Sequence, residues 1–242
     1  GNPEHPEVMW QLSEAIDGLA GACDALGLPV IGGNVSLYNE SDGADIDPTP
    51  VLGVLGLLDE LVAPPPGWSW RLGDAVVLVG ARAAAGDSDF PLGGSRWATR
   101  RERRGGRLGS LDVAQLSRTV AFVAGEVASV CAGAPGDLSA VHDVSGGGLG
   151  VALAEVAAAS GVGARVTGVS EHAELFTETP GRFVVATSDA TALLARAGAA
   201  GVPAQAVGTV GGASLVVGEL VDVAVDDIVR RRSGALPVML EL

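Results

Sequence analysis

The chain has 242 residues and a net charge of −14, with 15 basic against 29 acidic side chains. Every basic side chain is an arginine, which excludes a Walker-type phosphate lysine and a lysine Schiff base, and the acidity argues against nucleic acid as a partner. The two cysteines, Cys23 and Cys131, lie outside any CxxC pattern, which predicts reduced, buried thiols. No apolar run approaches the ~20 residues of a membrane span, which predicts a cytoplasmic protein with no membrane partner.

The first 60 residues combine one helix with two apolar strands. Residues 6–27 repeat apolar side chains at steps of three and four, which predicts an amphipathic helix with Pro6 in its first turn and Gly27 at its C-cap. The runs 28–31 and 49–58 predict short strands, the second apolar on both faces and therefore inside a covered sheet. The acidic stretch between them is expected to be a loop.

Three consecutive prolines at 64–66 predict a domain boundary, because they fit neither a helix nor a central strand. We therefore expect a partial domain at 1–62, a linker at 63–74 and a complete domain at 75–242. The latter alternates strands with helices, which predicts an α+β fold of mixed α/β layers. Its expected strands lie at 75–81, near 163–169, and at 181–187, 203–210 and 214–218, and its expected helices at about 112–132, at 189–200 and near 225–232. Within 138–160, a strand is expected to run into a glycine-rich turn that opens a helix near Gly148.

An irregular stretch at 82–110 carries six arginines between Arg96 and Arg107. It could contact phosphate or form a solvated surface loop, since charge runs usually stay hydrated. The segment 90–97, FPLGGSRW, predicts a glycine turn and has no chemistry of its own.

The segment GGNVS at 32–36 follows an apolar run and is a candidate ligand site. Its glycines allow the backbone to approach a ligand, the Asn34 amide oxygen suits a hard cation, and the Ser36 hydroxyl can bind a substrate. Since the first arginine is Arg71, any polyphosphate here would be held by backbone N–H groups and a divalent cation. An ordinary turn would use the same residues.

Two further stretches carry polar side chains near glycines. HDVSGGG at 142–148 places His142, Asp143 and Ser145 before a glycine-rich helix start, which could cap the helix or bind an anion or metal. A Ser-His-Asp triad is not expected, because a triad is assembled from separated positions. In LFTETPGRF at 175–183, Glu178 and Arg182 flank a turn and could form a structural ion pair.

The motifs GNPEHPEVMWQLSEAIDG, PVIGGNVSLYN, PTPVLGVLGLLD, HDVS followed by GGL and VALAE, and LF followed by PGRFVV occur in this order. Together they resemble the C-terminal portion of the phosphoribosylformylglycinamidine synthase family, over essentially the whole chain. The resemblance implies the end of an AIR-synthase-like N-terminal-type domain, which helps to form a central β-barrel, followed by a complete AIR-synthase-like C-terminal-type domain.

The resemblance also implies an activity. ATP phosphorylates the formamide oxygen of formylglycinamide ribonucleotide, and ammonia derived from glutamine displaces the phosphate to give the amidine. It implies Mg²⁺ and ATP as cofactors, with Gly33 at an ATP contact, Asn34 at a magnesium ligand and Ser36 at a substrate contact. In longer relatives with an auxiliary nucleotide site, the position of Asp143 binds magnesium and that of Ser145 contacts nucleotide.

The departures from the family pattern concern both the extent of the chain and single residues. The catalytic histidine and most magnesium carboxylates of the family lie in an N-terminal half that we expect this chain to lack. Gly146 and Arg96 each stand where the family usually has an acidic residue. We therefore expect the chain alone to be inactive as a synthetase.

The partners expected from the resemblance are the missing half, a glutaminase subunit and a small accessory subunit. Because the first domain is incomplete, we also expect exposed strand edges and self-association through residues 28–60. The alternatives are another AIR-synthase-like ATP-dependent enzyme, such as aminoimidazole ribotide synthetase or selenophosphate synthetase, and a non-catalytic half that binds nucleotide or serves only as a scaffold.

Overall fold

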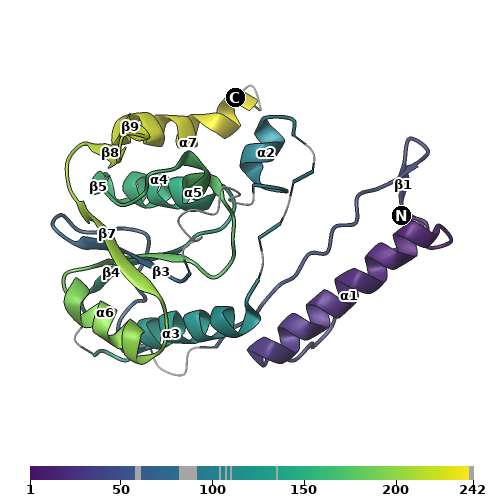
Figure 1. Cartoon of the computed structure of the whole chain (residues 1–242), viewed down its shortest axis with the longest axis horizontal. Helices are drawn as coiled ribbons and strands as arrows, with labels where there is room; N and C mark the ends of the chain where they lie inside the picture. Colours follow the sequence, from purple (N-terminus) through teal and green to yellow (C-terminus); the bar gives the residue numbers. More distant parts are fainter. Residues whose placement is uncertain are drawn as a thin grey trace. The chain divides into compact units, whose positions relative to one another are not determined.

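The computed structural model describes residues 1–57, 61–81 and 92–239, apart from residues 104, 107, 110 and 135. The chain divides into two compact units, Gly1–Leu58 and Asp59–Leu242 (Figure 1). Of the irregular stretch expected at 82–110, residues 82–91 together with 104, 107 and 110 lie outside the described residues. Within the described ranges, no helix combines the length and apolar character needed to cross a membrane.

The first unit consists of one long helix, a small hairpin and two extended segments. Helix α1, Pro6–Leu26, confirms the prediction from the apolar spacing, and its C-cap Gly27 is left-handed at φ 65°. The Gly27 backbone N–H donates to carbonyl groups of the last turn, as a glycine C-cap does. Strands β1, Glu40–Ser41, and β2, Ala44–Asp45, pair antiparallel inside the stretch expected to be an acidic loop.

The strands predicted at 28–31 and 49–58 are wrong for the described residues, since 28–39 and 46–57 contain no strand. Leu58 itself lies outside the described part. A strand needs a hydrogen-bonded neighbour, and apolar character alone does not supply one. The side chains of both segments are strongly exposed, with Ile31 87% and Val51 90% accessible. Cys23 in α1 is also only half-buried, contrary to expectation, whereas Cys131 in the second unit is buried.

The second unit contains a seven-stranded sheet among its described residues, in the order β4-β6-β3-β7-β5-β8-β9. All neighbours pair antiparallel except β5 and β8, which are parallel. The strands are β3 Ala75–Val79, β4 Leu138–Asp143, β5 Ala164–Val166, β6 Phe183–Thr187, β7 Ala204–Val210, β8 Ser214–Val217 and β9 Val221–Ala224. The α+β fold predicted from the alternating elements is confirmed.

Helices cover both faces of this sheet (Figure 1). They are α2 Arg96–Arg100, α3 Val113–Cys131, α4 Gly148–Ser160, α5 His172–Phe176, α6 Ala190–Ala199 and α7 Val225–Met239. In strand β3, Val76 and Leu78 pack in the core with α4, whereas Val77 and Val79 pack in a second core with α3 and α6. Alternation along a buried strand thus produces two apolar layers, one on each side of the sheet.

The segment 63–74, expected to be a linker, belongs to the second unit and packs against its sheet domain. Trp70 is buried, and its Nε1 donates to the backbone oxygen of Val162 at 2.8 Å. Asp74 is also buried and accepts a hydrogen bond from the hydroxyl of Ser139. The contacts therefore place residues 61–74 with the sheet, while the domain limits at 62 and 74 stay a prediction.

Three elements of the second unit were not predicted from the sequence, namely α2, α5 and β9. Helices α2 and α5 have five residues each, too few to show a helical repeat. Helix α7 extends to Met239, beyond the predicted end at 232. The longer helices α3, α4 and α6 match their predictions, and Asp112 and Asp189 cap α3 and α6 through their side chains.

Candidate functional site

The GGNVS loop of the first unit is open. Space is free within 4 Å of the position that a Cβ of Gly33 would occupy, so the chain itself does not require glycine there. The Asn34 side chain donates from Nδ2 to the Ser36 hydroxyl at 3.2 Å. That contact does not use the Asn34 amide oxygen. The roles predicted for Gly33, Asn34 and Ser36 stay predictions, with all three residues exposed.

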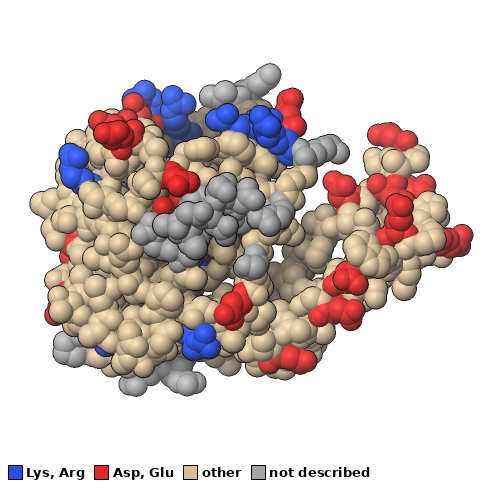
Figure 2. All heavy atoms as spheres, viewed as in Figure 1, with Lys and Arg blue, Asp and Glu red and all other residues tan. Residues whose placement is uncertain are grey.

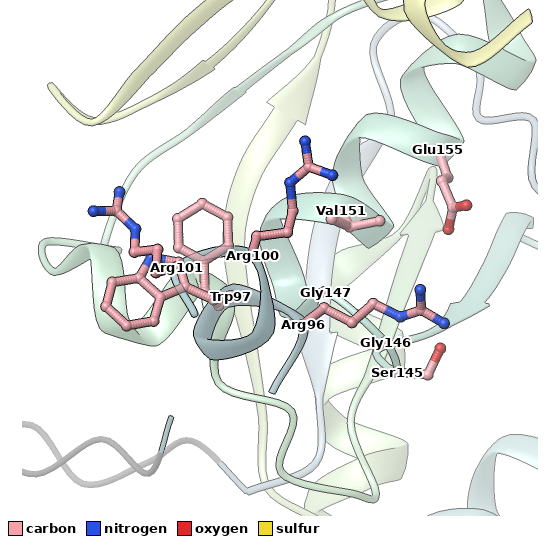
Figure 3. Close-up of a pocket in the computed structure, with 10 residues that line it drawn as sticks. Arg96, Trp97, Arg100, Arg101, Ser145, Gly146, Gly147, Val151 and Glu155 are labelled. Carbon is pink, nitrogen blue, oxygen red and sulfur yellow. The ribbon is translucent and has the colours of Figure 1, made fainter. Parts of the chain in front are cut away.

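A larger candidate site lies in the second unit, where α2 approaches the start of α4 (Figure 3). The pocket has a volume of about 870 Å³. Three arginines, two aromatic side chains and the glycine turn before α4 form most of its wall. The lining residues are Arg96, Trp97, Arg100, Arg101, Ser145, Gly146, Gly147, Val151, Glu155 and Phe176.

Glycine is required where α4 begins. Gly147 and Gly148 have φ of 93° and 71°, a left-handed conformation that side chains rarely adopt. A Cβ on Gly148 would lie 2.5 Å from the backbone oxygen of Leu175 and 2.7 Å from that of Thr177. The glycine turn thus allows the start of α4 to pack directly on the backbone around the end of α5.

Glu178 connects the two helices that line the pocket. Its Oε1 accepts from the backbone N–H of Arg96 at 2.7 Å and from that of Gly147 at 2.8 Å. A carboxylate is favourable at such helix starts, where N–H groups lack partners within the helix. The contact fixes the first residue of α2 relative to the N-cap of α4.

Arg182 holds the turn that carries Glu178. Its guanidinium is buried and donates to the backbone oxygens of Thr177 and Thr179. Burial lowers the pKa of Arg182 to about 10, and the negative charge of Glu174 partly offsets this by raising it. The side chain therefore remains cationic at neutral pH. The structural turn predicted at 175–183 is confirmed, whereas an ion pair between Glu178 and Arg182 is wrong, since both side chains bond to backbone groups.

His142 and Asp143 are not brought into the pocket. His142 is buried, its Nδ1 donates to the Asp143 backbone oxygen at 2.6 Å, and its ring lies 4.9 Å from that of Trp68. The Nε2 atom lies 3.3 Å from Glu155 Oε2 but is not aligned for a hydrogen bond, so it has no hydrogen-bond partner among the described residues. The carboxylate of Asp143 is 59% exposed. Ser145, by contrast, lines the pocket.

Arginine dominates the charge of the pocket wall. Figure 3 shows the Arg96 side chain extending toward Ser145 and the glycine turn. A Cβ on Gly146 would lie 2.7 Å from Arg96 Nε, so this guanidinium occupies the space beside residue 146. Arg101 stacks over the Trp97 ring, with its Cζ 4.8 Å from the ring centroid. Figure 2 shows several arginines over α2 and α7 and others isolated elsewhere on the second unit, while the charged groups displayed by the first unit are acidic.

Part of this site was visible in the sequence. The arginine run and the glycine-rich helix start are both evident in the sequence, but nothing in the sequence places one against the other. The contributions of Glu178, Glu155 and Trp97 were missed. In the described part of the chain, no group of three or more His, Cys, Asp or Glu side chains is arranged to hold a metal ion.

Comparisons with known proteins match both parts of the chain. Residues 71–220 match the AIR synthase related protein, C-terminal domain, and residues 1–58 match the AIR synthase related protein, N-terminal domain. The first match covers more than half of the chain.

The curated relatives are longer proteins. The chain is 40% identical over 245 residues to the phosphoribosylformylglycinamidine synthase subunit PurL of Frankia casuarinae, a match to 99% of this chain and 31% of the relative. It is 36% identical over 262 residues to the corresponding subunit of Zymomonas mobilis, covering 100% of this chain and 33% of that protein. The chain therefore spans about a third of the length of these relatives.

Two solved structures share the fold at low sequence identity. They are T. maritima PurL complexed with ATP, with a TM-score of 0.50, and T. maritima PurL complexed with FGAR, with a TM-score of 0.51. Each is 16% identical and covers 68% of this chain, against 27% and 29% of the respective solved chains.

Proposed function

Because this chain belongs to the AIR synthase related protein family, we propose that it is the C-terminal part of an ATP-dependent carbon–nitrogen ligase, a phosphoribosylformylglycinamidine synthase. The observation that carries the proposal is the 40% identity to a PurL subunit across 99% of the chain. The reaction would convert formylglycinamide ribonucleotide to its amidine in cytoplasmic purine biosynthesis, with ADP and phosphate released.

In this proposal the first unit supplies one wall of the ATP site. The backbone N–H of Gly33 would approach the phosphates, the amide oxygen of Asn34 would bind Mg²⁺, and the hydroxyl of Ser36 would contact the substrate. The donor chemistry fits, because Mg²⁺ in ATP-using sites is commonly held by one or two protein oxygens together with phosphate oxygens. Residues 1–70 contain no arginine, so bound Mg²⁺ would supply the positive charge that neutralises the phosphates there.

The second unit would contribute a second, auxiliary nucleotide contact. The geometry supports this role for Ser145, which lines the pocket beside the start of α4. Asp143, which lies two residues before Ser145 and outside the pocket lining, would be the magnesium ligand, and its carboxylate is 59% exposed.

The proposal requires partners for activity. The chain spans 31% of its Frankia relative, so the remaining substrate, magnesium and catalytic groups would come from an N-terminal half. A glutaminase subunit and a small accessory subunit would deliver the ammonia. Without them, we expect no synthetase activity from the chain.

Calorimetry with Mg-ADP tests the first-unit site. Asn34→Ala removes the amide oxygen while leaving an exposed loop intact, and we expect it to abolish the Mg-ADP binding assigned to the first unit. Asn39→Ala, a nearby exchange of the same type, serves as the control. Unchanged first-unit binding in Asn34→Ala would contradict the assignment, and absence of binding in every form would favour the alternative of a non-catalytic scaffold.

The exposed apolar segments at 28–39 and 46–57 favour an additional proposal, self-association of the first unit. Unpaired backbone and apolar side chains can be covered when a second copy adds a strand. Sedimentation across a concentration series tests this proposal. A monomer at all concentrations would contradict it.

A further inference from the structure

The pocket of the second unit carries a net positive charge. Its wall contains Arg96, Arg100 and Arg101 against a single carboxylate, that of Glu155. Among the ion pairs of the described residues, none involves these three arginines. They are exposed at the mouth of the pocket and are therefore available to an anionic ligand.

The Arg96 side chain occupies the space beside residue 146 in this wall. The Nε atom lies 2.7 Å from the point where a side chain of residue 146 would begin, and that residue is glycine. A guanidinium therefore stands where a carboxylate at 146 would otherwise project. A ligand that reaches the glycine turn meets the planar N–H donors of an arginine, whose geometry matches phosphate oxygens.

The start of α4 does not by itself supply the site. The Gly147 N–H already donates to Glu178, which also accepts from the Arg96 backbone. This bond fixes the backbone of Arg96 beside Ser145 and so limits where its side chain can reach. Arg101 is likewise restrained by its contact with the Trp97 ring. The backbone of Arg96 and the side chain of Arg101 are thus positioned before any ligand binds, which lowers the ordering cost of binding.

We propose that this pocket binds phosphate groups directly on arginine, with Arg96 as the principal contact, and that no divalent cation lies between the phosphate and the protein. The ligand class is a pyrophosphate-bearing small molecule. The inference concerns the second unit alone and does not depend on the magnesium site proposed at Asn34. It differs from the auxiliary role proposed for Asp143, because the cation that meets the phosphate is a side chain of the protein.

Calorimetric titration of the full chain with inorganic pyrophosphate in EDTA tests the proposal. We expect saturable binding that Arg96→Gln weakens by about tenfold or more, since a charge-assisted hydrogen bond is lost. Arg165→Gln, an exposed arginine on β5, is the matched control and should bind as the unaltered chain does. Failure to bind in EDTA, or equal affinity in Arg96→Gln, would overturn the proposal.

Gly146→Asp provides an independent variant. The φ of Gly146 is not positive, and the nearest atom belongs to a flexible arginine side chain, so the exchange should be accommodated. The new carboxylate would pair with Arg96, and we expect it to weaken pyrophosphate binding at least as much as Arg96→Gln. Unweakened binding would contradict the direct contact. Asn34→Ala should leave the EDTA titration unchanged, which separates this site from the magnesium site.

A titration with ADP in EDTA distinguishes a nucleotide ligand from recognition of the phosphates alone. Tighter binding of ADP than of pyrophosphate would support a nucleotide ligand, whereas weaker or equal binding would support recognition of the phosphates alone. In both cases the binding should depend on Arg96. ADP binding that appears only when Mg²⁺ is added would overturn the cation-free contact.

Discussion

Replacing Glu178 by alanine should destabilise the second unit. The carboxylate accepts two backbone N–H groups at 2.7 and 2.8 Å, one from each helix that lines the pocket. Alanine leaves both donors without this partner. The Gly147 bond is partly buried, so water replaces it poorly, whereas the Arg96 bond is exposed and water can replace it more readily.

The size of the effect follows from that difference. A hydrogen bond to a charged group contributes about 1.5–3 kcal/mol when it is shielded, and the exposed bond contributes less than about 1 kcal/mol. We therefore expect Glu178→Ala to lower the free energy of unfolding of the second unit by about 2–3 kcal/mol. Glu178→Gln keeps an oxygen acceptor but loses its charge, and should cost about 1 kcal/mol.

Urea unfolding followed by tryptophan fluorescence measures this change. Three of the four tryptophans, Trp68, Trp70 and Trp97, lie in the second unit, so a Trp10→Phe background restricts the signal to that unit. Glu171→Ala is the control, because the Glu171 side chain makes no capping bond at α5. If Glu178→Ala is no less stable than Glu171→Ala, the capping role assigned to Glu178 is wrong.

Three further exchanges test other parts of the structure. Arg182→Ala should cost about 3–5 kcal/mol, because it removes a buried cation that holds two backbone carbonyl groups; a loss below about 1 kcal/mol in urea unfolding would contradict this. Gly148→Ala should cost about 3 kcal/mol or more through its left-handed φ and its clash with backbone oxygens, while Gly150→Ala, which meets only ordinary contacts, should be neutral or slightly stabilising. The His5 pKa should lie above its ordinary value of 6.5, because Asp45 accepts a hydrogen bond from the ring, and the first unit should therefore lose this contribution as the pH rises through the His5 pKa. Asp45→Asn should return the His5 pKa toward 6.5, as measured by an NMR titration of the ring. An unchanged pKa would exclude the His5–Asp45 hydrogen bond as the cause of the raised value.

The elements that could be predicted from the sequence are those whose signal is local. Helix α1 shows its apolar repeat and its C-cap glycine within one segment, and α4 follows a glycine-rich turn. The strands expected at 28–31 and 49–58 failed because apolar runs indicate burial, while a strand also requires a partner for its backbone. Nothing in either run shows whether that partner belongs to the same chain.

The candidate site was predicted in fragments. The arginine run around Arg96 and the turn at Ser145 are both evident in the sequence, and Gly146 departs from the acidic residue usual in the family. Their meeting depends on contacts between distant segments, such as the Glu178 bond to the Arg96 backbone, which spans 82 residues. Because no local sequence pattern predicts a contact between such distant residues, the sequence leaves open whether the arginines face solvent or a ligand.

A single-turnover assay of ADP release tests the central claim, that this chain is one part of a formylglycinamide ribonucleotide synthetase, most directly. The pure chain would be mixed with ATP, Mg²⁺, ammonia and formylglycinamide ribonucleotide, alone and with the N-terminal two-thirds of the Frankia relative. We predict no substrate-dependent ADP from the chain alone and ADP release from the mixture. Release by the chain alone, or none from a mixture in which the two parts are shown to associate, would contradict the claim.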